Sequence, residues 1–161
     1  MKQTSVLFVC LGNICRSPMA EAVFRHLVGQ RSLSEMFSID SAGLIGFHEG
    51  ELPDSRMRSH AFRRGYSLTH RSRPVKKEDF DRFDLVIGMD NENVNGLRRL
   101  AASDEYRSKI HKMTEFSRRV EADVVPDPYY GGDKGFELVI DLLEDACEGL
   151  FDHLAGSGKS G

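Results

Sequence analysis

The chain has 161 residues, 40% of them hydrophobic and 29% charged, a size and composition typical of one globular domain. A net charge of -3 gives no reason to expect nucleic acid or an anionic membrane as a partner, and no apolar run approaches a membrane span. The N-terminal residues lead directly into the first predicted strand and leave no room for a signal peptide. We therefore expect a cytoplasmic protein with one domain over residues 1–155 and a disordered tail at 156–161.

The first predicted elements are a buried strand and an amphipathic helix. The apolar run Val6–Val9 leads without alternation to Cys10, a pattern typical of a strand buried on both faces of a parallel sheet. We expect Ser17 to cap the following helix, with Pro18 in its first position, and Gly29 to end it. Helical spacing places one apolar stripe on this helix, formed by Ala20, Val23, Phe24, Leu27 and Val28.

The rest of the chain alternates between strands and helices. Strands are predicted at 37–41, 84–89 and 109–113, and helices at 55–64, 91–100 and from 135 onward, with a short charged helix at 76–82. Asp54 and Asp90 are expected N-caps, Gly65 a helix stop, and Met57, Ala61 and Phe62 the inward residues of the helix at 55–64. The last helix carries an apolar stripe of Phe136, Val139, Ile140, Leu143, Ala146, Cys147, Leu150 and Leu154.

This alternation predicts an α/β fold. We expect a single-domain three-layer sandwich, in which a four-stranded parallel twisted sheet carries helices on both faces. Ligands bind beyond the carboxyl ends of the strands in such sheets, and Cys10, Ser41 and Asp90 all lie near these ends.

The loop from Cys10 to Arg16, between the first strand and its helix, favours anion binding. A tight turn into a helix N-terminus directs backbone N–H groups into one concavity, and Gly12 and Asn13 are residue types that tolerate left-handed backbone angles. Arg16 adds a planar cation that matches two oxygens of a phosphate. The helix dipole, the amides, Arg16 and the Ser17 hydroxyl all favour the thiolate form of Cys10. The loop therefore combines a nucleophile with a cradle for its target.

The sequence VCLGNICRSPMAEA around this loop resembles the signature of the low-molecular-weight protein tyrosine phosphatases, and DPYY at 127–130 resembles their general-acid loop. An isolated Asp-Pro is most often a turn, so the catalytic interpretation of Asp127 depends on this match. The likeness covers nearly the whole chain, because it continues through Asp40–Gly43, Pro53–Asp54, Thr69–His70, Glu78–Phe80, Phe83–Asp84 and Met89–Asp90.

The resemblance implies a phosphatase that acts through a phosphocysteine. Cys10 would attack phosphorus, and Asp127 would protonate the leaving phenolate and later take a proton from water. Arg16 and the loop amides would hold the phosphate oxygens, which adds Leu11, Gly12, Asn13, Ile14, Cys15 and Ser17 to the binding site. No metal or other cofactor is required, and no His, Cys or carboxylate group has ligand spacing in the sequence.

The resemblance also implies roles around this loop. Asn13, Ser41 and His70 match positions that support the phosphate loop by hydrogen bonds. Asp90 is expected either to brace the loop or Arg16, or simply to cap its own helix.

The substrate slot and a redox role come from the same resemblance. Phe47, Tyr129 and Tyr130 would form a slot for a flat phenyl ring, deep enough to exclude phosphoserine. Cys15 matches a thiol that can pair with Cys10 on oxidation. Expected partners are tyrosine-phosphorylated proteins, with a tyrosine kinase among the candidates, and inorganic phosphate or other oxyanions.

Two other functions remain as alternatives. A thiol arsenate reductase would need a downstream pair of cysteines, whereas only Cys147 lies downstream, on the inward stripe of the last helix where core packing explains it. A redox-sensing or oxyanion-binding module could use Cys10 and Cys15 alone, but it would have no use for Asp127 as a proton donor. Three cysteines without framework spacing do not indicate structural disulfides.

Overall fold

A four-stranded sheet forms the centre of the protein, as seen in the computed structural model, which describes residues 3–129 and 132–159. The strands are β1 (Thr4–Cys10), β2 (Phe37–Gly43), β3 (Leu85–Gly88) and β4 (Ile110–Lys112). Their order is β2-β1-β3-β4, and every neighbouring pair is parallel. The predicted sheet is confirmed, and all four strands end at the same edge, where β1 leads into the Cys10 loop.

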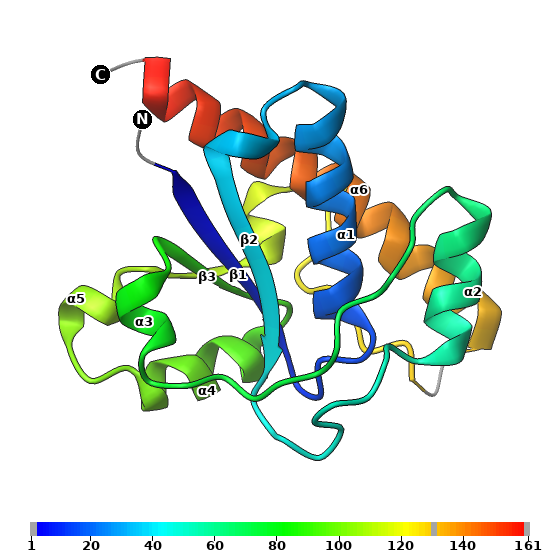
Figure 1. Ribbon diagram of the computed structural model, residues 1–161, viewed down its shortest axis with the longest axis horizontal. Helices are drawn as coiled ribbons and strands as arrows, with labels where there is room; N and C mark the ends of the chain where they lie inside the picture. Colours follow the sequence, from blue (N-terminus) through cyan, green and yellow to red (C-terminus); the bar gives the residue numbers. More distant parts are fainter. Residues whose placement is uncertain (1–2, 130–131, 160–161) are drawn as a thin grey trace.

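Helices cover both faces of this sheet (Figure 1). The helices α1 and α6 lie together on one face, with α2 beside them, while α3, α4 and α5 lie on the other. Their bounds are α1 (Arg16–Gln30), α2 (Ser55–Arg63), α3 (Asp79–Arg82), α4 (Asn91–Leu100), α5 (Asp104–Arg107) and α6 (Gly132–Lys159), with short 3-10 turns η1 (Ser34–Met36) and η2 (Met113–Phe116). The expected three-layer sandwich is therefore confirmed. No described helix combines the length and the apolar character that crossing a membrane requires.

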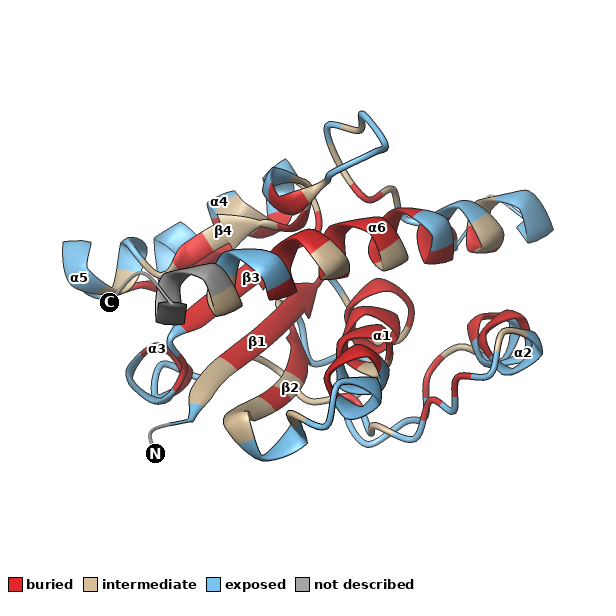
Figure 2. Ribbon diagram, turned by 90° about the horizontal axis from the view of Figure 1, so that it is seen from above, coloured by how far each residue is buried: buried red, intermediate tan, exposed pale blue. Residues whose placement is uncertain are grey.

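Two apolar clusters, one on each face of the sheet, form the core. Val6 and Phe8 of β1 face the cluster beneath α1 and α6, whereas Leu7 and Val9 face the cluster beneath α3 and α4. All four side chains are fully buried, and Figure 2 shows β1 in red beyond its first residues, which are tan. This two-sided burial explains why the apolar run in the sequence does not alternate.

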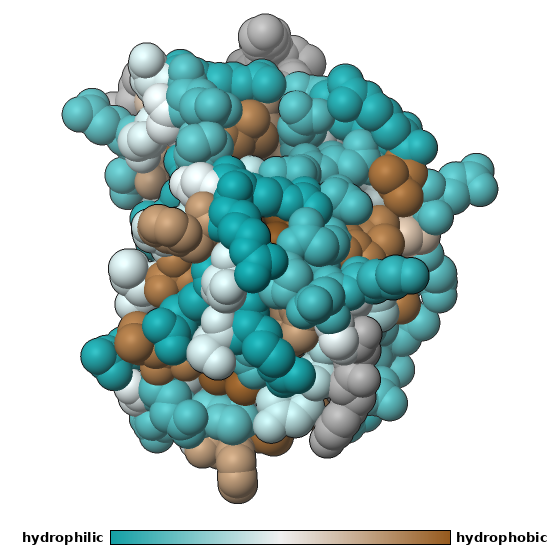
Figure 3. All heavy atoms as spheres, turned by 90° about the vertical axis from the view of Figure 1, so that its right-hand side faces the viewer, coloured by the Kyte–Doolittle hydropathy of each residue, from teal (hydrophilic) through white to brown (hydrophobic). Residues whose placement is uncertain are grey.

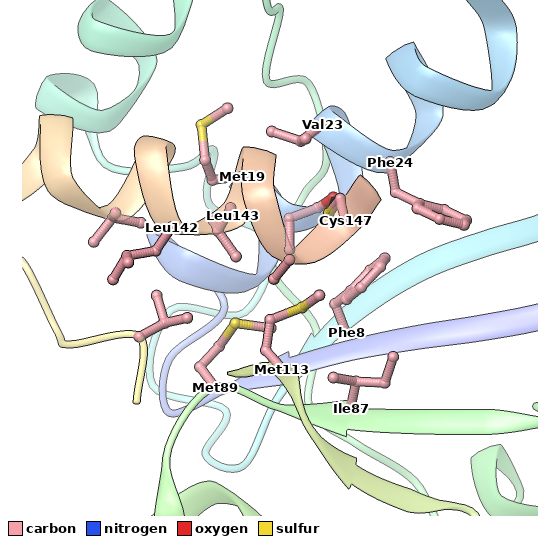
Figure 4. Close-up of a cluster of buried hydrophobic side chains, with 14 of the residues drawn as sticks. Phe8, Met19, Val23, Phe24, Ile87, Met89, Met113, Leu142, Leu143 and Cys147 are labelled. Atoms are coloured by element: carbon pink, nitrogen blue, oxygen red, sulfur yellow. Dashed lines mark hydrogen bonds between the residues drawn. The ribbon is translucent and has the colours of Figure 1, made fainter. Parts of the chain in front are cut away.

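The predicted apolar stripe of α6 lies in this core and packs against α1 (Figure 4). Cys147 is fully buried in this cluster, where Figure 4 shows it among Phe8, Phe24 and Leu143. Burial raises the pKa of its thiol, which therefore stays protonated. The interpretation of Cys147 as a core residue is confirmed.

Several details of the predicted helices differ from the structure. Helix α1 begins at Arg16, and Ser17 makes no cap, because its hydroxyl bonds the Cys10 loop instead. Gly29 does not end α1, since the helix continues to Gln30 and Ser32 adopts the left-handed conformation that turns the chain. The structure also contains α5 and two 3-10 turns, which are too short to show helical periodicity in the sequence. Helix α6 begins three residues earlier than expected and continues through 156–159, while residues 160–161 lie outside the described residues.

The structure also corrects the inner face of α2, because Phe62 does not lie inward with Met57 and Ala61. Phe62 is 76% exposed, whereas His60 is buried beside Met57 and Ala61. The ring of His60 stacks on Phe136 and hydrogen-bonds Glu137 and Asp133 at the start of α6.

A polar network fastens α2 to α6 on a largely hydrophilic face of the molecule (Figure 3). Arg64, at the end of α2, forms ion pairs with Glu137, Asp141 and Glu144 of α6. The partners of His60 and Arg64 lie some 70 to 80 residues away in the sequence. Helical periodicity does not reveal such distant partners, and this is why it predicted the inner position for Phe62 and not for His60.

Candidate active site

The Cys10 loop lies at the carboxyl edge of the sheet, and the sulfur of Cys10 points toward the start of α1. Cys10 Sγ lies 3.1 Å from Ser17 Oγ and accepts a hydrogen bond from the Ser17 backbone N–H at 3.4 Å. Cys10 is 3% exposed and still lines an open pocket. The thiol is therefore held by α1 and faces a space that a ligand can enter.

Arg16 is the buried cation of this loop. Its guanidinium donates to Asp90 Oδ2 at 2.6 Å and to the carbonyl of Val125 at 3.0 Å, and lies 3.9 Å from Asp127 Oδ2. Burial alone would lower the pKa of Arg16, but Cys10, Asp90 and Asp127 outweigh burial and raise it. The guanidinium is therefore permanently charged and fixed from two sides.

Asp90 combines both of the roles that the sequence left open. Its Oδ1 accepts the backbone N–H of Asn93 at 2.8 Å, which caps α4, and its Oδ2 binds Arg16. The carbonyl of Val125 also binds the Arg16 guanidinium. The sequence analysis did not predict this contact, because a backbone group carries no residue-type signal.

Asn13 holds the loop in shape. It is fully buried, and its φ of 58° lies in the left-handed region. Its Nδ2 donates to Ser17 Oγ at 2.7 Å and to Ser41 Oγ at 3.1 Å, while its Oδ1 lies 3.0 Å from His70 Nε2. The structure thus brings together the three expected supporting residues. Gly12, by contrast, has no positive φ, so the left-handed turn belongs to Asn13 alone.

Three charged residues that the sequence analysis did not select extend this network. Ser41 Oγ donates to Glu21 Oε1 at 2.7 Å, and Arg73 contacts Asp40 Oδ2 at 3.1 Å. The backbone N–H of Arg73 donates to Asn13 Oδ1 at 3.0 Å. Only their three-dimensional neighbours distinguish these residues from ordinary surface charges.

Glu21, Asp40 and His70 form a group whose ligand atoms all lie within 4.8 Å of one another, which the sequence spacing did not indicate. His70 Nδ1 lies 3.4 Å from a carboxylate oxygen of each acid. Both carboxylates also accept hydrogen bonds, Glu21 from Arg25 and Asp40 from the Ser41 backbone. Protein donors therefore occupy this group, which supports the loop from behind the pocket.

The end of β2 is pressed against the loop. The backbone N–H groups of Leu44 and Ile45 donate to the carbonyls of Cys10 and Leu11, each at 3.0 Å. A Cβ on Gly43 would lie only 3.0 Å from the backbone of Gly12 and Leu11, so this close approach requires glycine. The residues that follow β2 are thereby fixed relative to Cys10.

The pocket above Cys10 has a volume of about 310 Å³. Its lining includes most of the predicted binding residues, together with Ile45 and His48, which the sequence did not single out; the lining residues are Cys10, Leu11, Gly12, Ile14, Cys15, Arg16, Ile45, Phe47, His48, Asp127 and Tyr129. Phe47 is 81% exposed at the rim. Tyr130 lies outside the described residues. An aromatic pair thus flanks an opening whose floor carries the thiol.

Asp127 comes from a loop more than a hundred residues after Cys10 and lines the same pocket. Its Oδ1 accepts the backbone N–H of Tyr129 at 2.9 Å, and its side chain is 46% exposed. The guanidinium of Arg56 in α2 lies 5.3 Å from the centre of the Tyr129 ring. The Asp127 loop is thus held by its own turn and by α2.

Cys15 also lines the pocket and is 4% exposed. Burial, with smaller contributions from Asp54, Cys10 and Asp127, raises the pKa of its thiol well above the ordinary value. At neutral pH Cys15 is therefore a protonated thiol, and the structure holds Cys10 and Cys15 as free cysteines.

Comparisons with known proteins identify the family of this chain. Residues 5–160 match the family model described as low molecular weight phosphotyrosine protein phosphatase. A low molecular weight protein-tyrosine-phosphatase of Streptomyces coelicolor is 44% identical over 90% of both chains, and the human phosphotyrosine phosphatase of this type is 40% identical over 92% of this chain and 94% of its own. The crystal structure of a protein tyrosine phosphatase from Entamoeba histolytica, with Hepes in its active site, is 47% identical, has a TM-score of 0.94, and covers 97% of this chain and 99% of its own. The chain therefore belongs to the low molecular weight phosphotyrosine protein phosphatase family.

Proposed function

We propose that Cys10, Arg16 and Asp127 hydrolyse phosphotyrosine through a phosphocysteine intermediate. The chain is a protein-tyrosine phosphatase by its family. One observation carries the assignment of roles: a thiol, a buried guanidinium and a carboxylate, drawn from the end of β1, the start of α1 and a distant loop, line one pocket. Nucleophile, anion clamp and proton donor are the three groups that this reaction requires.

The first step transfers the phosphoryl group to sulfur. The Cys10 sulfur forms a bond to phosphorus while the bond from phosphorus to the tyrosine oxygen breaks. Arg16 and the loop amides stabilise the equatorial oxygens, and Asp127 gives its proton to the departing phenolate. In the second step Asp127 takes a proton from water as that water attacks phosphorus, which releases phosphate and the thiolate.

The pocket walls favour an aromatic phosphate ester. Phe47 and Tyr129 line the opening and can flank a phenyl ring, whereas the short side chain of phosphoserine would not bring its phosphate to the floor. The Entamoeba relative holds Hepes, a sulfonic acid, in its active site. This supports the binding of phosphate and similar oxyanions by the present chain.

The two alternatives are weaker. Arsenate reduction would need thiols beyond Cys10 and Cys15, but Cys147 is fully buried in the core. A pure redox sensor would not explain the carboxylate of Asp127 in the pocket. Tyrosine-phosphorylated proteins as partners and a cytoplasmic location complete the proposal.

The test is hydrolysis of aryl phosphates in the presence of a chelator. Cys10→Ser should be inactive, because a hydroxyl is a much poorer nucleophile here. Asp127→Ala should lose far more rate on phosphates with poor leaving groups than on those with good ones, since only a poor leaving group needs the proton. Equal losses on both would refute the acid role, and full activity of Cys10→Ser would refute the mechanism. A phosphoserine peptide serves as the negative substrate.

A further inference from the structure

A second hollow adjoins the catalytic pocket on the side of α4. It has a volume of about 560 Å³ and lies between the residues that follow β2 and one face of α4. Leu11 and Ile45 line both this hollow and the catalytic pocket. These two residues form a shared rim, which the backbone hydrogen bond from Ile45 to Leu11 holds in place. We call the second hollow the α4 groove; its lining residues are Leu11, Leu44, Ile45, Glu92, Asn93, Asn95, Gly96, Arg99 and Leu100.

The floor of the α4 groove is apolar and partly open to solvent. Leu11 is 44% exposed, Ile45 is 45% exposed, and Leu100 is 37% exposed. Leu44 packs on Gly96, where an added Cβ would lie 2.8 Å from a Leu44 methyl group. The glycine therefore lets the segment after β2 sit directly on α4. A continuous apolar surface thus leads from the rim of the catalytic pocket along the helix.

The far end of the groove carries an unpaired cation. Arg99 is exposed, and among residues 3–129 and 132–159 no carboxylate forms an ion pair with it. Glu92 lines the same groove two helical turns earlier, close to Asp90 and therefore to the catalytic end. The groove is consequently acidic near the phosphate site and basic away from it.

We propose that the α4 groove binds the residues that flank phosphotyrosine in a peptide substrate, with an apolar side chain on Leu44 and Leu100 and an acidic side chain at Arg99. The inference rests on the proposed function, because the rim joins the groove to the pocket that takes the phosphotyrosine. Two features of the groove indicate this occupant: an apolar floor beside the site of the phosphotyrosine and, farther along α4, a guanidinium that has no ion-pair partner among the described residues.

The spacing of the acidic residue follows from the helix. Arg99 lies nine residues beyond Asp90, which contacts Arg16, so the two are separated by about 14 Å along α4. An extended peptide covers this distance in about four residues. The acidic residue should therefore lie between about three and five positions from phosphotyrosine, on one side of it.

Arg98 provides the matched control. It is the exposed neighbour of Arg99 in α4 and carries the same charge, but it does not line the groove. Arg98→Glu and Arg99→Glu change the net charge equally, so long-range steering of an acidic peptide should affect both in the same way. A difference between the two variants isolates the local contact.

The experiment measures kcat/KM for synthetic phosphotyrosine peptides and for p-nitrophenyl phosphate in about 0.15 M salt, where screening is strong beyond about 8 Å. Each peptide carries a single Asp at one position, between three and five residues before or after the phosphotyrosine. The same peptide with Asn at that position is the reference. For one position the wild type should favour Asp about fivefold, as expected for a partly exposed ion pair. Arg99→Glu should remove or invert this preference, whereas Arg98→Glu should keep it within about twofold.

A second variant tests the apolar floor. Leu100→Ser should lower the preference for Leu over Ala between phosphotyrosine and the acidic residue, by about threefold for a half-exposed contact. No dependence on the acidic position, or equal effects of the two arginine variants, would overturn the proposal. So would a change of oligomeric state in Arg99→Glu with unchanged peptide kinetics, which would make the groove a contact between copies. Failure of the wild type to hydrolyse p-nitrophenyl phosphate would instead refute the proposed function.

Discussion

Substitution of Asp90 separates the two roles that its two oxygens perform. Oδ1 caps α4 through the Asn93 N–H, and Oδ2 holds the guanidinium of Arg16 at 2.6 Å. Serine at this position still offers an oxygen to the helix N-terminus but none that reaches Arg16, whereas alanine offers neither. The pair Asp90→Ser and Asp90→Ala therefore differs in the cap alone.

The structure sets the expected magnitudes. A lost N-cap costs about 1 kcal/mol, so the Ala variant should be about that much less stable than the Ser variant. Both lose the main partner of Arg16, a residue only 3% exposed, which should cost about 3 kcal/mol of unfolding free energy relative to wild type. With the guanidinium held only by Val125 and by Asp127 at 3.9 Å, kcat/KM should fall about 100-fold in both variants.

Denaturant unfolding and the hydrolysis of p-nitrophenyl phosphate provide the two measurements. The variants should share one kcat/KM within about threefold and differ in unfolding midpoint. If Asp90→Ser keeps wild-type activity while Asp90→Ala does not, the carboxylate acts only as a cap, and the reasoning about Arg16 is refuted.

Three further predictions concern the loop, a buried carboxylate and the second thiol. Asn13→Ala loses the side-chain hydrogen bonds of Asn13 and should lose about 3 to 4 kcal/mol of unfolding free energy. Asn13→Gly should lose slightly less, because glycine accepts the φ of 58° without strain. A smaller loss in the Ala variant than in the Gly variant would contradict this prediction. Burial would raise the pKa of Asp145, but hydrogen bonds from the backbone N–H groups of 118–120 outweigh it and lower that pKa. The stabilising contribution of the Asp145 carboxylate is therefore complete above the unfolded pKa of about 3.9 and is lost as the pH falls below that value. The difference in unfolding free energy between wild type and Asp145→Asn should therefore close in acid. A difference that does not change with pH would contradict this prediction. Cys15→Ser should keep its activity but recover it poorly after peroxide and reductant, and equal recovery would remove the protective role of Cys15.

Much of the fold could be predicted because its signals are local. The apolar run before Cys10 and the stripe of α6 both reflect burial that the residue types record directly. The inner face of α2 could not be predicted in this way. His60 occupies it because Asp133 and Glu137 of a distant helix bind its ring, and Phe62 is turned outward as a result.

The same distinction between local and long-range signals applies to the residues of the candidate site. The loop from Cys10 to Arg16 is contiguous, so its residue types alone indicate a nucleophile beside an anion cradle. Glu21 and Arg73 reach the loop only through Ser41 and Asn13, and the carbonyl of Val125 has no side-chain signature at all. Contacts that depend on chain crossings or on backbone atoms leave no pattern in a single sequence.

The most direct test of the mechanism is rapid denaturation of the enzyme at alkaline pH, where the acid-labile S–P bond of phosphocysteine survives, during turnover of an aryl phosphate, followed by mass spectrometry of its peptides under the same conditions. The wild type should carry a phosphoryl group on Cys10 alone, and Asp127→Ala should accumulate more of this species when the leaving group is good, because hydrolysis then lacks its base. Phosphate found on Ser17 or on another residue, or turnover with no phosphorylated peptide in either protein, would contradict the central claim that the Cys10 sulfur is the nucleophile.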